Sequence, residues 1–90
     1  MMKAPLHIIK YAKNRDLLVS LRIGKDGVTD SLIKELDAQL RSKNIIKLKA
    51  NKQILASSEQ RNTVFLDLAN STNSSLIFQR GNVAVYWRPK

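Results

Sequence analysis

Residues 21–29, Leu-Arg-Ile-Gly-Lys-Asp-Gly-Val-Thr, combine the end of an apolar run, two closely spaced glycines and the start of a helix. Thr29 is a favourable helix N-cap, and Asp30 suits the positive end of the helix dipole. A strand, a glycine loop and a helix in direct succession indicate an α/β fold. Such a junction also points backbone N–H groups at an anion, and glycines let a polymer backbone approach closely.

The glycine loop, Gly24-Lys25-Asp26-Gly27, has two readings. In RNA-binding KH modules a G-x-x-G loop clamps the sugar-phosphate backbone, and Lys25 would add positive charge at such a contact. In the simpler reading, the glycines make a tight turn before a helix, and Asp26 hydrogen-bonds its own backbone. Because four residues alone are a weak signal, the rest of the chain has to decide between these readings.

The remainder of the chain alternates between strand and helix periods. Strand patterns cover residues 17–23, 45–50, 76–80 and 83–88, and helix patterns cover 29–44 and 59–73. Pro5 begins a short helix that ends near Lys13, and Gly81-Asn82 is a two-residue hairpin connection. This order, (α)βαβαββ, predicts an α/β two-layer sandwich in which helices cover one face of a four-stranded mixed sheet. The length suits a single domain over residues 1–90, with 1–16 as a loosely defined N-terminal segment.

Apolar residues spaced three and four apart mark the buried face of each long helix. These residues are Val28, Leu32, Ile33, Leu36 and Leu40 in the first, and Val64, Phe65, Leu68, Ala69 and Thr72 in the second. Strand alternation directs Ile46, Leu48 and Ala50 toward the same core. We also assign Phe78 to the core. Trp87 is in line with Val83 and Val85 along its strand, and we assign it to the core as well.

Positive charge is concentrated outside the two long helices. The formal net charge is +9, yet residues 26–44 and 57–74 carry −1 each. Residues 1–25 carry +5, and residues 45–56 and 75–90 carry +3 each. A net charge of this size implies attraction to a polyanion, and its uneven distribution favours one binding surface over a uniformly basic protein.

If the helices cover one face of the sheet, the residues that alternate away from the core lie on the other face. They are Ser20, Arg22, Lys47, Lys49, Gln79, Tyr86 and Arg88. Basic side chains around an accessible ring, Tyr86, suit a strand of RNA, because cations contact phosphates and the ring stacks on a base. In the simpler reading, the lysines keep the sheet soluble and block pairing at its edges. The charge distribution favours the binding reading.

Several classes of function lack the residues that they need. The chain has no cysteine and a single histidine, His7, so a thiolate metal site or a histidine-based triad is unavailable. Its carboxylates do not assemble with a nucleophile and an oxyanion donor, so we expect no enzyme activity, metal or cofactor. No apolar run reaches the length of a membrane span and no signal-peptide pattern begins the chain, so we expect a cytoplasmic protein without a membrane partner.

Three stretches of the chain resemble the motifs of one known family. Residues 22–29, Arg-Ile-Gly-Lys-Asp-Gly-Val-Thr, resemble the family's I-G-K-x-G-L/V-T signature. Leu36 and Leu40, followed by Ile-Ile-Lys-Leu-Lys at 45–49, look like its helix running into an L-I-K-V-K strand. Residues 80–88, Arg-Gly-Asn-Val-Ala-Val-Tyr-Trp-Arg, are similar to its terminal G-K-x-x-V-L-Y-R hairpin. The family that these motifs resemble is that of the CRM domains, the YhbY-like RNA-binding proteins, and the resemblance extends over residues 17–90.

The resemblance implies a fold related to the C-terminal domain of translation initiation factor three. It implies binding of structured RNA, in ribosome assembly or in intron splicing. The residues that match the family motifs are Gly24, Lys25, Gly27, Lys47, Lys49, Gly81 and Arg88. Two positions depart from the family pattern: Arg80 stands where an apolar residue is common, and Trp87 replaces a tyrosine.

We therefore expect a non-catalytic binder of structured RNA, ribosomal or pre-ribosomal. Its contacts would be Arg22, Gly24, Lys25, Asp26, Gly27, Lys47, Lys49, Arg80, Gly81, Tyr86 and Arg88. We expect a monomer rather than a dimer, and no small-molecule substrate. Two alternatives stay open: an Alba-like protein that coats DNA or RNA as a dimer, and a protein-interaction module on the ribosome.

Overall fold

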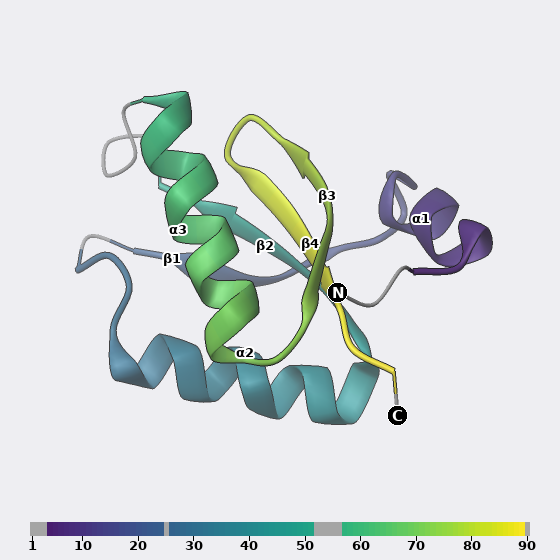
Figure 1. The fold of residues 1–90 in the computed structure, drawn as a ribbon, viewed down its shortest axis with the longest axis horizontal. Coiled ribbons are helices and arrows are strands. Elements are labelled where there is room, and N and C mark those ends of the chain that lie inside the picture. The colour runs from purple at the N-terminus through teal and green to yellow at the C-terminus, as the bar shows by residue number, and fades with distance from the viewer. Residues whose placement is uncertain (1–3, 25, 52–56, 90) are drawn as a thin grey trace.

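A computed structural model of the chain describes residues 4–24, 26–51 and 57–89 (Figure 1). The helices and strands follow one another as α1 (Leu6–Ala12), β1 (Val19–Ile23), α2 (Asp30–Lys43), β2 (Ile45–Ala50), α3 (Ser58–Ser71), β3 (Ser75–Arg80) and β4 (Val83–Trp87). This is the predicted (α)βαβαββ order. Among the described residues, no helix is long and apolar enough to cross a membrane.

The four strands form one mixed sheet in the order β1-β2-β4-β3. The pair β1–β2 is parallel, because α2 crosses over between the two strands, and the other two pairs are antiparallel. Gly81, with a φ of 57°, closes the β3–β4 hairpin in a left-handed conformation that favours glycine. The predicted α/β sandwich with a four-stranded mixed sheet is confirmed.

Both long helices begin at the residues whose side chains can cap them. The Thr29 hydroxyl oxygen accepts a hydrogen bond of 3.1 Å from the backbone N–H of Leu32, at the start of α2. The Ser57 hydroxyl accepts one of the same length from Gln60 at the start of α3. Asn44 follows α2 with a φ of 71°, a conformation that asparagine tolerates better than most residues. Local sequence thus fixes the helix ends.

The main core lies between the sheet and the helices α2 and α3. It contains the predicted stripes of both helices and the inward residues of β2, with Leu36, Ile46, Leu48 and Phe65 completely buried. Thr72 is buried as well, and its hydroxyl donates to the carbonyl of Leu68. The stripe begins one turn later than predicted: Val28 is 42% exposed, because it precedes the N-cap of α2 and lies outside the helix.

The short helix α1 packs against the sheet face opposite α2 and α3, at the right of Figure 1. A second cluster there, the α1 cluster, contains Ala12, Leu17 and Val85, with Ile45, Ile77 and Phe78 packed against it. The prediction of helices on one face therefore describes α2 and α3, whereas α1 covers part of the other face. We call the sheet face away from α2 and α3 the open face.

The side chains of the last hairpin alternate in the opposite phase from the predicted one. Ala84 and Tyr86 point into the main core and are fully buried, whereas Val85 belongs to the α1 cluster. The prediction that Tyr86 is accessible is therefore wrong, and so is the placement of Trp87 in the core: Trp87 lies on the open face and is only partly buried. Gln79 also points to the helix side, where its amide donates to Asn62 of α3.

Candidate nucleic-acid interface

Three basic side chains form a row across the open face. Arg22 of β1 lies beside Lys49 of β2, Lys49 lies opposite Val83 of β4, and Val83 lies opposite Arg80 of β3. Their sequence neighbours face the main core or α3, so these four side chains alternate to the open face. With strands about 4.8 Å apart, the row spans about 14 Å between its outer backbone positions.

Arg22, Lys49 and Arg80, which we call the basic row, are all exposed. Lys47 lies one pleat away on the same face, opposite Val85, and is half-buried. None of these four cations makes an ion pair with any residue that the structure describes. Their charges are therefore available to a ligand.

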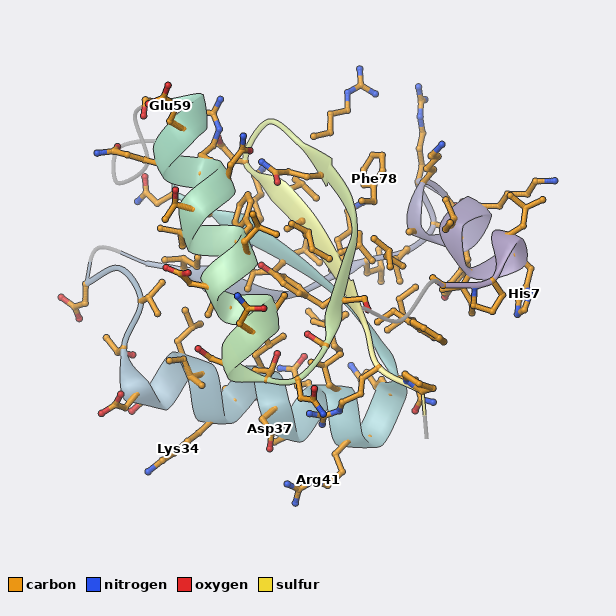
Figure 2. All side chains as sticks on the ribbon, viewed as in Figure 1. His7, Lys34, Asp37, Arg41, Glu59 and Phe78 are labelled. Atoms are coloured by element: carbon orange, nitrogen blue, oxygen red, sulfur yellow. The ribbon has the colours of Figure 1, made fainter. Side chains whose placement is uncertain are left out.

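The acidic side chains lie elsewhere. The four strands contain no aspartate or glutamate, whereas five of the seven carboxylates are on α2 and α3: Asp30, Glu35, Asp37, Glu59 and Asp67. Figure 2 shows Asp37 and Glu59 on the two helices that cover the opposite face. A sheet face with only positive charge, backed by a helical layer with balanced charge, attracts a polyanion to one side of the molecule.

The glycine loop joins β1 to α2 at the same edge of the sheet as Arg22. The backbone N–H of Gly27 donates to the carbonyl of Gly24 at 3.0 Å, which closes a tight turn. Gly27 has a φ of 71°, so the turn itself requires a glycine there. Asp26 is exposed. Lys25, the predicted charge at the contact point, lies outside the described residues.

Gly24 differs from Gly27 in the reason for having no side chain. It is exposed, and a Cβ atom built on Gly24 would meet nothing within 4 Å. Neither internal packing nor a left-handed backbone conformation therefore requires a glycine at this position. The position leaves space for a close approach from outside.

Comparison with known proteins shows the family and the fold of the chain. The family model of the CRS1 / YhbY (CRM) domain matches residues 10–88. The chain belongs to the CRM family. The match confirms the predicted resemblance of the chain to this family. No curated protein matches the chain in sequence.

The fold of this CRM domain is similar to a solution structure of a hypothetical protein from Staphylococcus aureus, described as "a putative RNA binding protein". The two share 21% sequence identity and superpose with a TM-score of 0.73, over 91% of this chain and 84% of the other. At this identity the likeness shows the fold.

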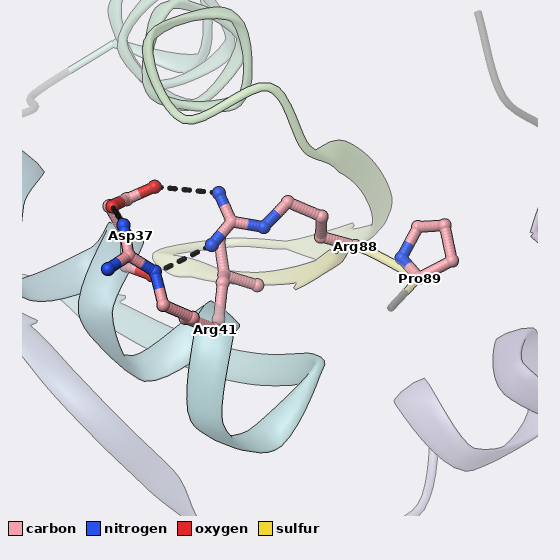
Figure 3. A pocket seen from close by; sticks show the side chains of 5 residues that line it. Asp37, Arg41, Arg88 and Pro89 are labelled. Carbon is pink, nitrogen blue, oxygen red and sulfur yellow. Dashed lines mark hydrogen bonds and ion pairs between the residues drawn. The ribbon is translucent and has the colours of Figure 1, made fainter.

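Two predicted contacts of the CRM domain are not on the open face. The Tyr86 ring is in the core, where its hydroxyl donates to the Phe65 carbonyl at 2.9 Å, and burial raises the pKa of Tyr86. The Arg88 guanidinium lies on the helix side and donates to the Asp37 carboxylate at 2.7 Å (Figure 3). It also donates to the Thr72 carbonyl at 2.7 Å. Neither residue is placed for the predicted contact with RNA.

Arg88 instead connects the C-terminal end of β4 to both long helices. Its second nitrogen donates to the backbone carbonyl of Asp37 at 2.9 Å, and Arg41 pairs with the same carboxylate from one turn along α2. Asp37, Leu40, Arg41, Arg88 and Pro89 line a pocket of about 370 Å³ at this junction (Figure 3). Hydrogen bonding from Arg88 lowers the pKa of Asp37. The group stabilises the fold by holding three elements together.

The structure therefore brings together Arg22, Lys47, Lys49 and Arg80 and leaves Tyr86 and Arg88 out. A two-residue turn at Gly81-Asn82 places Arg80 and Val83 on the same face. Because Arg80 points to the open face, Val83 does so too, and alternation along β4 then directs Ala84 and Tyr86 into the main core. The two-residue turn is therefore the sequence signal that gives the correct phase of the hairpin. In the part of the chain that the structure describes, no group of three acidic or histidine side chains could hold a metal ion.

Proposed function

We propose that this CRM domain is a non-catalytic RNA-binding protein that holds structured RNA between its glycine loop and the basic row. Membership of the CRM family and the described role of the staphylococcal protein support RNA as the partner. The observation that carries the proposal is the segregation of charge, with unpaired cations on the open face and the carboxylates largely on the helices.

We propose that the bound RNA is ribosomal or pre-ribosomal. The protein would act as a monomer in the cytoplasm, in ribosome assembly or RNA folding. A phosphate would approach the backbone at Gly24, where open space replaces a side chain, and Lys25 would add charge there. The basic row would contact further phosphates along the same strand. Crosslinking in cells followed by sequencing of the attached RNA tests the choice of RNA directly.

Gly24→Asp tests the loop, because it adds a carboxylate where a phosphate would approach while leaving the fold intact. We expect its affinity for a ribosomal RNA fragment, measured by gel shift, to fall about tenfold or more, with an unchanged melting temperature. The matched control is Gln60→Glu, which makes the same change of net charge at an exposed position of α3. Gly27→Asp is unsuitable, because the backbone at Gly27 is left-handed.

Two results would contradict the proposal. If Gly24→Asp and Gln60→Glu bind RNA equally well, the loop is not part of the interface. If the protein binds duplex DNA as tightly as structured RNA and light scattering shows a dimer, the Alba-like function replaces the one proposed here.

A further inference from the structure

The open face holds two aromatic side chains, Phe78 and Trp87, that the predicted phase of the last hairpin wrongly places in the core. Of the five aromatic residues, Phe65 and Tyr86 are buried in the main core, and Tyr11 is exposed on α1. Phe78 and Trp87 lie on the open face and are partly buried. Only these two are therefore candidates for contact with a ligand on the sheet.

Phe78 reaches the open face by regular alternation with Arg80, and an irregularity in β3 lies directly before it. The pairing of β3 with β4 shifts between Leu76 and Phe78, so that Leu76 packs against the main core while both Ile77 and Phe78 pack against the α1 cluster. A bulge of this kind redirects a side chain and is often found at sites of function. Figure 2 shows Phe78 projecting from β3 on the side away from α3.

Two cations, Arg80 and Lys47, lie near Phe78 on this face. Arg80 is two residues further along β3, on the same face and about 7 Å away along the strand. Lys47 lies in the same cross-strand row as Phe78, with Val85 between them. By contrast, the cross-strand neighbours of Trp87 are Ile45 and Ser75, which carry no charge. The phosphate of a nucleotide whose base lay on Phe78 would therefore be within reach of Arg80.

We propose that Phe78 stacks on an unpaired base, so that the RNA bound by the open face contains a single-stranded segment. The inference rests on the proposed function and specifies the class of RNA. An aromatic ring between cations recognises the face of a base together with its phosphate, and a base is available for stacking only where it is not paired within a helix. A fully paired RNA would reach the basic row through its phosphates alone.

The test compares a hairpin RNA with an unpaired loop and a blunt duplex of the same stem. We expect Phe78→Leu, which keeps an apolar side chain in the α1 cluster, to bind the hairpin about tenfold more weakly and the duplex with unchanged affinity. Phe78→Tyr keeps the ring and should bind both RNAs like the wild type. Ile77→Val is the control for loss of packing, because Ile77 packs against the same cluster.

A second measurement needs no variant. With 2-aminopurine placed in turn at each loop position, stacking on Phe78 should change the emission of at least one position when the wild-type protein binds, and Phe78→Leu should abolish that change. The inference is overturned if no loop position responds, or if Phe78→Leu binds the hairpin as tightly as the wild type. A wild-type protein that binds neither RNA would instead overturn the proposed function.

Discussion

Tyr86 is the residue whose role differs most between the predicted and the observed phase of the last hairpin. As a base-stacking residue it would contribute to RNA affinity. In the structure its ring is buried in the main core and its hydroxyl donates a hydrogen bond to the Phe65 carbonyl. We expect Tyr86→Phe to lower the free energy of unfolding by about 1 kcal/mol, because a buried hydrogen bond is lost. The melting temperature of a domain of this size should fall by about 4–8 °C.

RNA affinity provides the control for this prediction. A buried ring makes no contact with a ligand, so Tyr86→Phe should bind RNA like the wild type at a temperature where both are folded. Thermal melts and gel shifts of the same preparation check both parts. Lower affinity with an unchanged melting temperature would contradict the buried role of Tyr86.

Among the elements, the orientation of β2 was predictable from its own side chains and that of β4 was not, for a physical reason. In β2 the apolar residues Ile46, Leu48 and Ala50 alternate with two lysines, and this alternation has one interpretation. In β4 every side chain is apolar or aromatic, because the main core covers one face and the α1 cluster covers part of the other. Alternation within β4 therefore does not show which of its side chains face the main core. The helix α1 has only seven residues, too few for its pattern to show which face of the sheet it covers.

The caps of the long helices and the hairpin turn were predictable because each depends on one or two local residues. The candidate site was predictable where charge alternates with apolar residues, as at Lys47 and Lys49. At Phe78 only the hairpin turn gives the phase, through Arg80, because the consecutive apolar residues Leu76, Ile77 and Phe78 show no alternation of their own. Nor did the sequence show that Arg88 points toward α2, because the partner carboxylate lies 51 residues away in the chain.

The junction of α2, α3 and the end of β4 should respond to acid through Asp37. The hydrogen bond from Arg88 lowers the pKa of Asp37 below its usual value of 3.8, so the folded state favours the charged form. This contribution to stability is present above about pH 4 and is lost as the pH falls through the lowered pKa. We expect Asp37→Asn to be less stable than the wild type at pH 6, and the difference to shrink toward pH 2.

Urea unfolding between pH 2 and pH 7 measures this difference. Asp67→Asn is the matched control, because Asp67 is exposed on α3 and makes no ion pair with the described residues. It removes the same charge without removing a link between elements. If the difference in free energy of unfolding between the wild type and Asp37→Asn stays constant over this range, the carboxylate does not act through its ionised form.

For the whole molecule, the arrangement of charge matters more to RNA binding than its total. Lys49→Gln with Arg80→Gln removes two charges from the basic row, and Lys34→Gln with Lys43→Gln removes two exposed charges from α2. Both double variants have a net charge of +7, two below the wild-type +9. If binding depended on net charge alone, they would lose affinity equally.

We expect them to differ, because each phosphate contact releases counterions and contributes about 0.7–0.9 to the slope of log affinity against log salt. The variant of the basic row should lose about 1.4–1.8 from this slope, whereas the α2 variant should keep the wild-type slope. Fluorescence anisotropy with one RNA at several salt concentrations measures both slopes. Equal slopes in the two variants would mean that the open face attracts RNA only as part of a uniformly basic protein, since counterions are released where phosphates are contacted.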